Sequence, residues 1–109
     1  MPSYKEFLST LETGLRDLVR KTVKEFPKEA EQDARAFLSK SEEDLKRWTK
    51  ALGGGHMSPK DFDWLVQGKA EVAKMRALKL AGWAEARIDR FRSSLLSLVV
   101  DTAVAVFLA

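Results

Sequence analysis

The sequence has no cysteine and only one histidine, and these shortages exclude several kinds of chemistry. Without cysteine, the 109-residue chain can form no disulfide, no thiolate metal site and no cysteine nucleophile. His56 follows directly after three glycines, so a metal site or a Ser-His-Asp site would have to be built around a loop residue. We therefore expect no catalytic, cofactor-binding or metal site, and a protein that is not an enzyme.

The chain also lacks a strong excess of either charge. Nineteen basic and sixteen acidic residues leave a net charge of +3. The most basic stretch, residues 69–92, alternates basic with acidic residues around the helix, so we do not expect nucleic acid as a partner. The start of the chain is polar and has no secretory signal pattern, and we expect a cytoplasmic protein.

What the chain has in abundance is apolar residues at intervals of three and four, which predict an all-α fold. Its length and its hydrophobic content of 45% fit one helical domain over residues 1–109. The capping-box spacing of Ser3 and Glu6 begins a helix over about 3–25, and Pro27 ends it.

A second apolar stripe predicts a helix over about 28–52. The spacing passes through Ser41 unchanged, which favours one continuous helix over a break near Lys40. The two helices would form a helical hairpin, followed by a flexible glycine loop at 53–57. Trp48 and Trp64 fall on or beside the apolar stripes of the chain, so we expect both in the core.

The residues after the glycine loop predict one long third helix. Ser58 and Pro59 are typical of a helix start, and no proline follows. The apolar spacing continues over about 59–106, which corresponds to roughly 70 Å of helix. Gly82 allows either a bend in this helix or a reversal of the chain, and a reversal would give an antiparallel four-helix bundle instead.

The last part of the chain, residues 93–109, is an apolar helical segment in which Asp101 is the only ionisable side chain. A hairpin of shorter helices would leave it uncovered, so we expect it to self-associate as a coiled-coil-like homo-oligomer or to bind another helical protein. The apolar residues that we expect at the oligomer interface are Phe91, Leu95, Leu98, Val99 and Val106.

Polar residues form one narrow stripe along this otherwise apolar segment. They recur at intervals of three, four, three and four, and they are Arg87, Arg90, Ser94, Ser97 and Asp101. Such spacing places them on one side of a helix, where they would face water or line a shared axis.

Two functional hypotheses follow. The first is a non-enzymatic helical assembly or adaptor protein that self-associates through its apolar C-terminal helix. The second is a small membrane-associated protein on the cytoplasmic face of a membrane, with residues 93–109 as a tail anchor or an oligomeric membrane helix. The membrane alternative rests on the arginines that directly precede the apolar segment, Arg87, Arg90 and Arg92. Neither hypothesis includes a small-molecule substrate.

Overall fold

The computed structural model describes residues 2–108, and every regular element in that range is a helix. The all-α fold predicted from the sequence is therefore confirmed. The outermost residues of the predicted domain and of the apolar segment, Met1 and Ala109, lie outside the described range. The helices are α1 (Tyr4–Thr22), α2 (Pro27–Lys40), α3 (Glu42–Gly53), α4 (Pro59–Gln67), α5 (Arg76–Leu80) and α6 (Glu85–Phe107).

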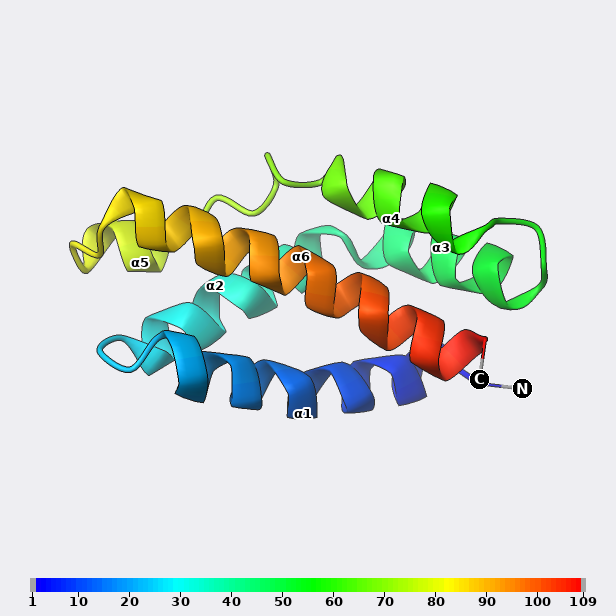
Figure 1. The fold of residues 1–109 in the computed structure, drawn as a ribbon, viewed down its shortest axis with the longest axis horizontal. Helices are drawn as coiled ribbons and strands as arrows, with labels where there is room; N and C mark the ends of the chain where they lie inside the picture. Colours follow the sequence, from blue (N-terminus) through cyan, green and yellow to red (C-terminus); the bar gives the residue numbers. More distant parts are fainter. Residues whose placement is uncertain (1, 109) are drawn as a thin grey trace.

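The helices run as four antiparallel passes (Figure 1). The first pass is α1, the second is α2 followed by α3, the third is α4 followed by α5, and the last is α6. The start of α1 and the end of α6 consequently lie at the same end of the molecule (Figure 1). Helix α6 contacts α1, α3, α4 and α5, so the other passes pack around it.

Helix α1 begins as the capping-box spacing predicts. The Ser3 hydroxyl accepts a hydrogen bond of 3.2 Å from the backbone N–H of Glu6. The face that α1 buries carries Phe7, Leu11 and Leu15. The helix ends at Thr22, a few residues before Pro27, which occupies the first turn of α2.

The continuous helix predicted over 28–52 is wrong, because the structure breaks it at Ser41 into α2 and α3. Backbone hydrogen bonds still cross the break, from Ser41 N–H to the carbonyl of Phe37 and from Leu45 N–H to the carbonyl of Ser41. The bend lets the two halves pack on different neighbours: α2 contacts α1 and α5, whereas α3 contacts α4 and α6.

The single helix predicted over 59–106 is also wrong, because residues 68–75 and 81–84 leave the helical conformation. In and beside these two non-helical segments, the backbone is bound by side chains from other parts of the chain. The Asp33 carboxylate accepts hydrogen bonds of 2.9 Å from the N–H groups of Ala77 and Leu78, and Arg92 Nε donates one of 2.7 Å to the carbonyl of Ala73. These contacts satisfy backbone groups at the start of α5 and in the preceding loop without a continuous helix.

The chain reverses at Gly82, which was the alternative that the sequence left open. Gly82 has a φ of +85°, a left-handed conformation that an L side chain rarely adopts. The N–H of Trp83 then donates a hydrogen bond of 3.1 Å to the carbonyl of Leu78, which closes the turn. Helix α6 therefore folds back along α4 and α5 instead of extending away from the hairpin.

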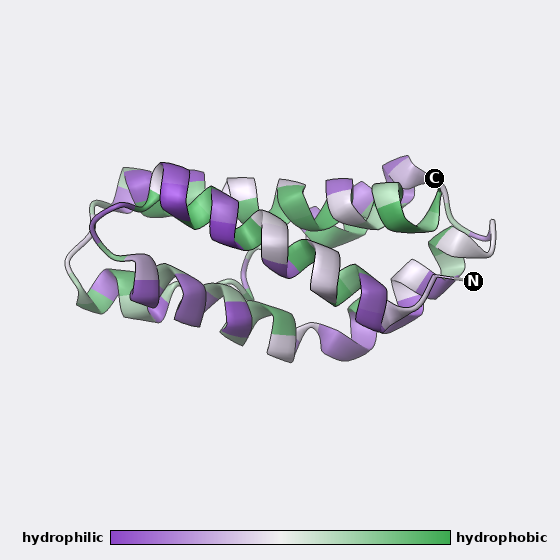
Figure 2. Ribbon diagram, turned by 90° about the horizontal axis from the view of Figure 1, so that it is seen from below, coloured by the Kyte–Doolittle hydropathy of each residue, from purple (hydrophilic) through white to green (hydrophobic). Residues whose placement is uncertain are grey.

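The core is one cluster of buried side chains to which all six helices contribute. Figure 2 shows the corresponding alternation of hydrophobic and hydrophilic residues along the helices. The two tryptophans that were expected in the core differ from each other in their burial. Trp48 is half-buried against the core, whereas Trp64 is 76% exposed on α4. The expectation that Trp64 anchors the core is therefore wrong.

Candidate functional site

The inner face of α6 is already covered by the chain's own helices. Of the residues predicted to form an oligomer interface, Phe91, Leu95 and Val99 are at most 2% exposed, and Leu98 and Val106 are half-buried. The first three pack in the core because the reversal at Gly82 brings α6 back against α1 and α4. The sequence prediction assumed that these side chains would be left uncovered. That assumption is wrong, because the chain's own helices remove these three side chains from water.

The outer face of α6 carries the predicted polar stripe. Ser94 is half-buried, and the other four members are exposed, namely Arg87, Arg90, Ser97 and Asp101. The structure thus brings all five predicted stripe residues to one solvent-facing side of a single helix.

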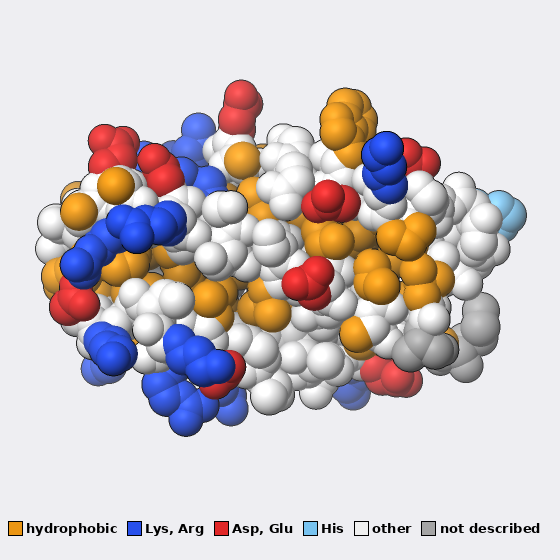
Figure 3. Space-filling model, in the orientation of Figure 1, with side chains coloured by type: hydrophobic (Ala, Val, Ile, Leu, Met, Phe, Trp, Pro, Cys, Tyr) orange, Lys and Arg blue, Asp and Glu red, His pale blue; other side chains and the backbone are white. Residues whose placement is uncertain are grey.

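The polar stripe borders a long hollow between α1 and α6, which we call the α1–α6 groove. It consists of three adjoining hollows of about 410, 450 and 530 Å³. The first two share Thr22 and Ser94, and the last two share Gly14 and Asp101. Figure 3 shows this face of the molecule, with Lys and Arg side chains gathered over the end where α1 finishes and α6 begins.

Gly14 on α1 shapes the floor of the groove. A Cβ at this position would lie 2.9 Å from Leu98 Cδ1, closer than side chains normally approach. The missing side chain lets the half-buried Leu98 lie against α1. The middle of the groove therefore has a shallow apolar floor between polar rims.

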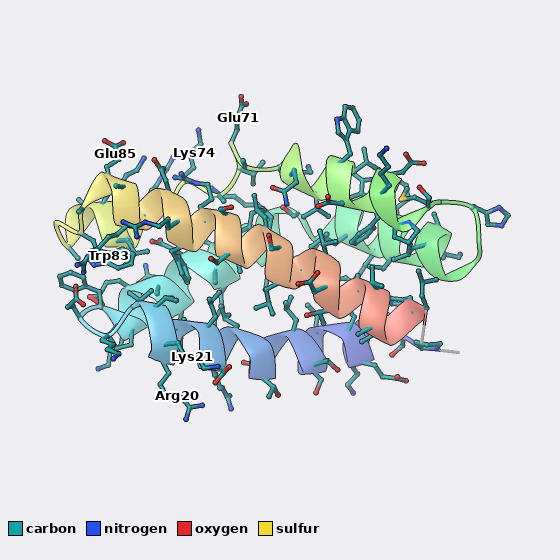
Figure 4. All side chains as sticks on the ribbon, viewed as in Figure 1. Arg20, Lys21, Glu71, Lys74, Trp83 and Glu85 are labelled. Atoms are coloured by element: carbon teal, nitrogen blue, oxygen red, sulfur yellow. The ribbon has the colours of Figure 1, made fainter. Side chains whose placement is uncertain are left out.

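At the basic end of the groove, several charges are already paired within the chain. Glu25 Oε2 accepts hydrogen bonds of 3.0 Å from Trp83 Nε1 and 3.2 Å from Arg87 Nη1. Figure 4 shows Trp83 at this end of the molecule and Arg20 and Lys21 projecting from the end of α1. Both of these α1 residues lie within 4.0 Å of Asp17, so the exposed positive charge here is partly neutralised.

Arg90 and Asp101 differ from the other charged residues of the polar stripe. Within residues 2–108, neither side chain has an oppositely charged group within 4.0 Å, whereas Arg87 pairs with Glu25. They lie three helical turns apart, which is about 16 Å along α6. The α1–α6 groove thus carries one unpaired positive and one unpaired negative charge at separate positions on its α6 side.

Apart from the α1–α6 groove, a hollow of about 490 Å³ lies between α2 and the region around α5. Leu80 at its edge is 89% exposed. Asp33 also borders this hollow, but both of its carboxylate oxygens are occupied by backbone N–H groups of α5. Its role here is that of a helix cap.

The structure also bears on three other features considered from the sequence: a metal site, a membrane-spanning helix and the position of His56. Residues 2–108 contain no group of three His, Asp or Glu side chains placed to hold a metal ion. In the same range no helix has the length and hydropathy needed to cross a membrane. His56 is exposed in the turn after α3.

Comparisons of this chain with models of protein families, with curated proteins and with solved structures find no match.

Sequence reasoning missed the α1 side of the groove. Gly14, Leu18 and Thr22 line it opposite the stripe of α6. Periodicity alone does not say which helices are neighbours, so this pairing was not accessible. The one local signal was Gly14, a glycine inside a strongly periodic helix, where it weakens the helix unless close packing requires it.

Proposed function

We propose that this chain is a non-enzymatic helical assembly protein that self-associates through the exposed face of α6. The observation that carries the proposal is the α1–α6 groove, in which Arg90 and Asp101 have no ion-pair partner among residues 2–108. Charges of opposite sign on one surface favour a partner with the complementary arrangement and select its orientation.

The surface proposed here is the polar side of the C-terminal helix, whereas the sequence predicted self-association through its apolar side. The apolar side packs in the core of the single chain, so the side that remains for a partner is the polar stripe. A polar surface is compatible with this role, because non-obligate interfaces are about as apolar as the rest of a protein surface. The half-buried Leu98 in the floor of the groove supplies an apolar contact at the centre.

Light scattering on the full-length chain over a wide range of protein concentrations tests the proposal. We expect a mass above the 12.3 kDa of one chain, rising with concentration. Ser97→Tyr adds a ring on the exposed face of α6 and should return the protein to the monomer. Ser39→Tyr is the matched control, because Ser39 is an exposed helical serine on α2 outside the groove.

Two results would contradict the proposal. One is a wild-type mass of one chain at every concentration. The other is an oligomer that Ser97→Tyr and Ser39→Tyr affect equally, since the association would then use another surface.

The adaptor role rests on a different observation, the 89% exposure of Leu80 beside the hollow between α2 and α5. Three basic residues, Lys40, Lys74 and Arg76, border this hollow together with two acidic ones, Glu29 and the helix-capping Asp33. The excess of positive charge fits an amphipathic helix of another protein with acidic flanks. A photo-crosslinking residue at position 80 should give one discrete product in cells, and the same residue at the exposed position of Lys50 should not. Equal patterns at the two positions would remove the adaptor role.

A further inference from the structure

The polar stripe of α6 is self-complementary when its direction is reversed. Arg90, Ser94, Ser97 and Asp101 follow one another at intervals of four, three and four residues. Turning the helix end over end about the point between the two serines exchanges Arg90 with Asp101 and Ser94 with Ser97. At 3.6 residues per turn, all four positions fall within a sector of about 60° of the helix surface. After this turn the four side chains occupy the same four positions. The position that carried the positive charge now carries the negative one, and the reverse.

We propose that the α1–α6 groove receives a second copy of this chain, whose α6 runs antiparallel to the first, so that Arg90 of each copy pairs with Asp101 of the other. This arrangement rests on the self-association proposed above. A twofold axis that passes between Ser94 and Ser97, perpendicular to α6, produces both ion pairs together, as an interface between identical surfaces requires.

The chemistry of the face supports this orientation over the parallel one. In a parallel pair, Arg90 would face Arg90 and Asp101 would face Asp101, and like charges in contact oppose association. Arg87 adds no unpaired positive charge, because Glu25 already pairs with it within the chain. The small side chains of Ser94 and Ser97 stand at the centre, where the two helices approach most closely.

The size of the face is also sufficient. The whole molecule extends 42 Å by 23 Å across the view of Figure 1, in which α1 and α6 lie side by side and the other helices fill the rest of the outline. A standard protein interface covers about 800 Å² on each partner. A dimer contact of standard size would therefore cover most of this side of each copy.

Charge reversal tests the arrangement by sedimentation of the full-length protein. Arg90→Asp places two negative charges at each contact and Asp101→Arg places two positive charges there, so each variant should dimerise at least about tenfold more weakly than the wild type. The double variant R90D/D101R restores opposite charges at both contacts and should recover the dimer. An equimolar mixture of the two single variants should also associate, because each supplies the charges that the other needs.

Matched controls separate this effect from net charge. Lys60→Asp and Glu71→Arg make the same charge changes as the two groove variants, at exposed positions outside the α1–α6 groove. Figure 4 shows Glu71 projecting away from the molecule. Both controls should dimerise like the wild type. Circular dichroism of every variant checks that the helices are retained.

The outcomes distinguish the arrangement from the wider proposal. If the wild type associates but the single reversals do not weaken it, or the double reversal does not restore it, the antiparallel arrangement is wrong and self-association stands. If the wild type is a monomer at every concentration, self-association and the arrangement fail together. Weak single variants with a restored double variant and a productive mixture support the proposal.

Discussion

The carboxylate of Asp33 on α2 accepts a hydrogen bond of 2.9 Å from the backbone N–H of Leu78 on α5, 45 residues further along the chain. Its second oxygen accepts one of 2.9 Å from the N–H of Ala77. No side chain at the N-cap of the five-residue α5 caps it, so Asp33 supplies acceptors for its first turn. The Asp33 carboxylate thereby fixes α5 against α2, directly before the reversal that returns α6 to the core.

Asp33→Ala should destabilise the protein, because it leaves two backbone donors without acceptors. Each buried donor left unpaired costs about 1–3 kcal/mol, so we expect the free energy of unfolding, measured in urea, to fall by at least about 1 kcal/mol. Asp63→Ala is the control, since Asp63 is exposed and its carboxylate accepts, among residues 2–108, only one hydrogen bond, of 3.2 Å from Gln67 Nε2. An Asp33→Ala protein as stable as this control would show that Asp33 does not hold α5.

Gly82→Ala should also lower stability, through the backbone alone. An added Cβ would meet nothing within 4 Å, but the φ of +85° costs an L residue about 1–2 kcal/mol. Gly82→Asn should cost less, because asparagine tolerates the left-handed region better than alanine. Thermal unfolding of the two variants measures the difference. Equal stability of Gly82→Ala and the wild type would argue against the reversal at this position.

Ser41→Ala should leave stability unchanged or raise it by up to about 1 kcal/mol. The Ser41 hydroxyl is fully buried between α2 and α3 and has no hydrogen-bond partner among residues 2–108, so removing it removes an unfavourable burial. Ser39→Ala at an exposed site gives the baseline for the change in helix propensity. Urea unfolding compares the two variants. A loss of more than about 1 kcal/mol relative to Ser39→Ala would mean that the hydroxyl has a partner.

Tyr4 should ionise about two pH units later than an ordinary tyrosine. Burial, and to a smaller extent the negative charge of Glu42, raises its pKa from 10.0 to about 12. Because the raised pKa favours the neutral phenol in the folded state, its contribution to stability is complete below pH 10 and is lost between pH 10 and 12. Tyr4 is the only tyrosine, so phenolate absorbance follows it directly.

Glu42→Gln should lower the midpoint of that titration only in part, since burial is the larger cause of the shift. Tyr4 lines a hollow together with Lys46 of α3 and Phe107 at the end of α6. A midpoint near 10 in the folded wild type would contradict this placement of Tyr4.

The sequence predicted those features that depend on neighbouring residues. The caps at Ser3 and Ser58 are present, and each hydroxyl accepts a hydrogen bond from an N–H three residues later. Residues 85–106 are helical as expected, and the polar stripe lies on one side of α6. Capping and periodicity act within a few residues, which explains why they are readable from sequence alone.

The features that sequence reasoning missed depend on contacts between distant segments. Asp33 and Arg92 bind the backbone that interrupts the predicted third helix, and no local pattern reveals either contact. The interface prediction failed at Phe91, Leu95 and Val99 for the same reason. A long helix without a reversal leaves these side chains uncovered, whereas the reversed chain buries them.

The most direct test of the central claim, that two copies meet antiparallel at the exposed face of α6, is chemical crosslinking through single cysteines. The chain has no native cysteine, so Ser97→Cys and Ala105→Cys each carry one thiol, and both positions are exposed beside the groove. In the antiparallel dimer the two positions 97 are offset by about 4–5 Å along α6, whereas the two positions 105 are about 28 Å apart. A short bismaleimide should therefore link Ser97→Cys into a covalent dimer and leave Ala105→Cys monomeric. Absence of a dimer from Ser97→Cys, or equal yields from the two variants, would contradict the claim.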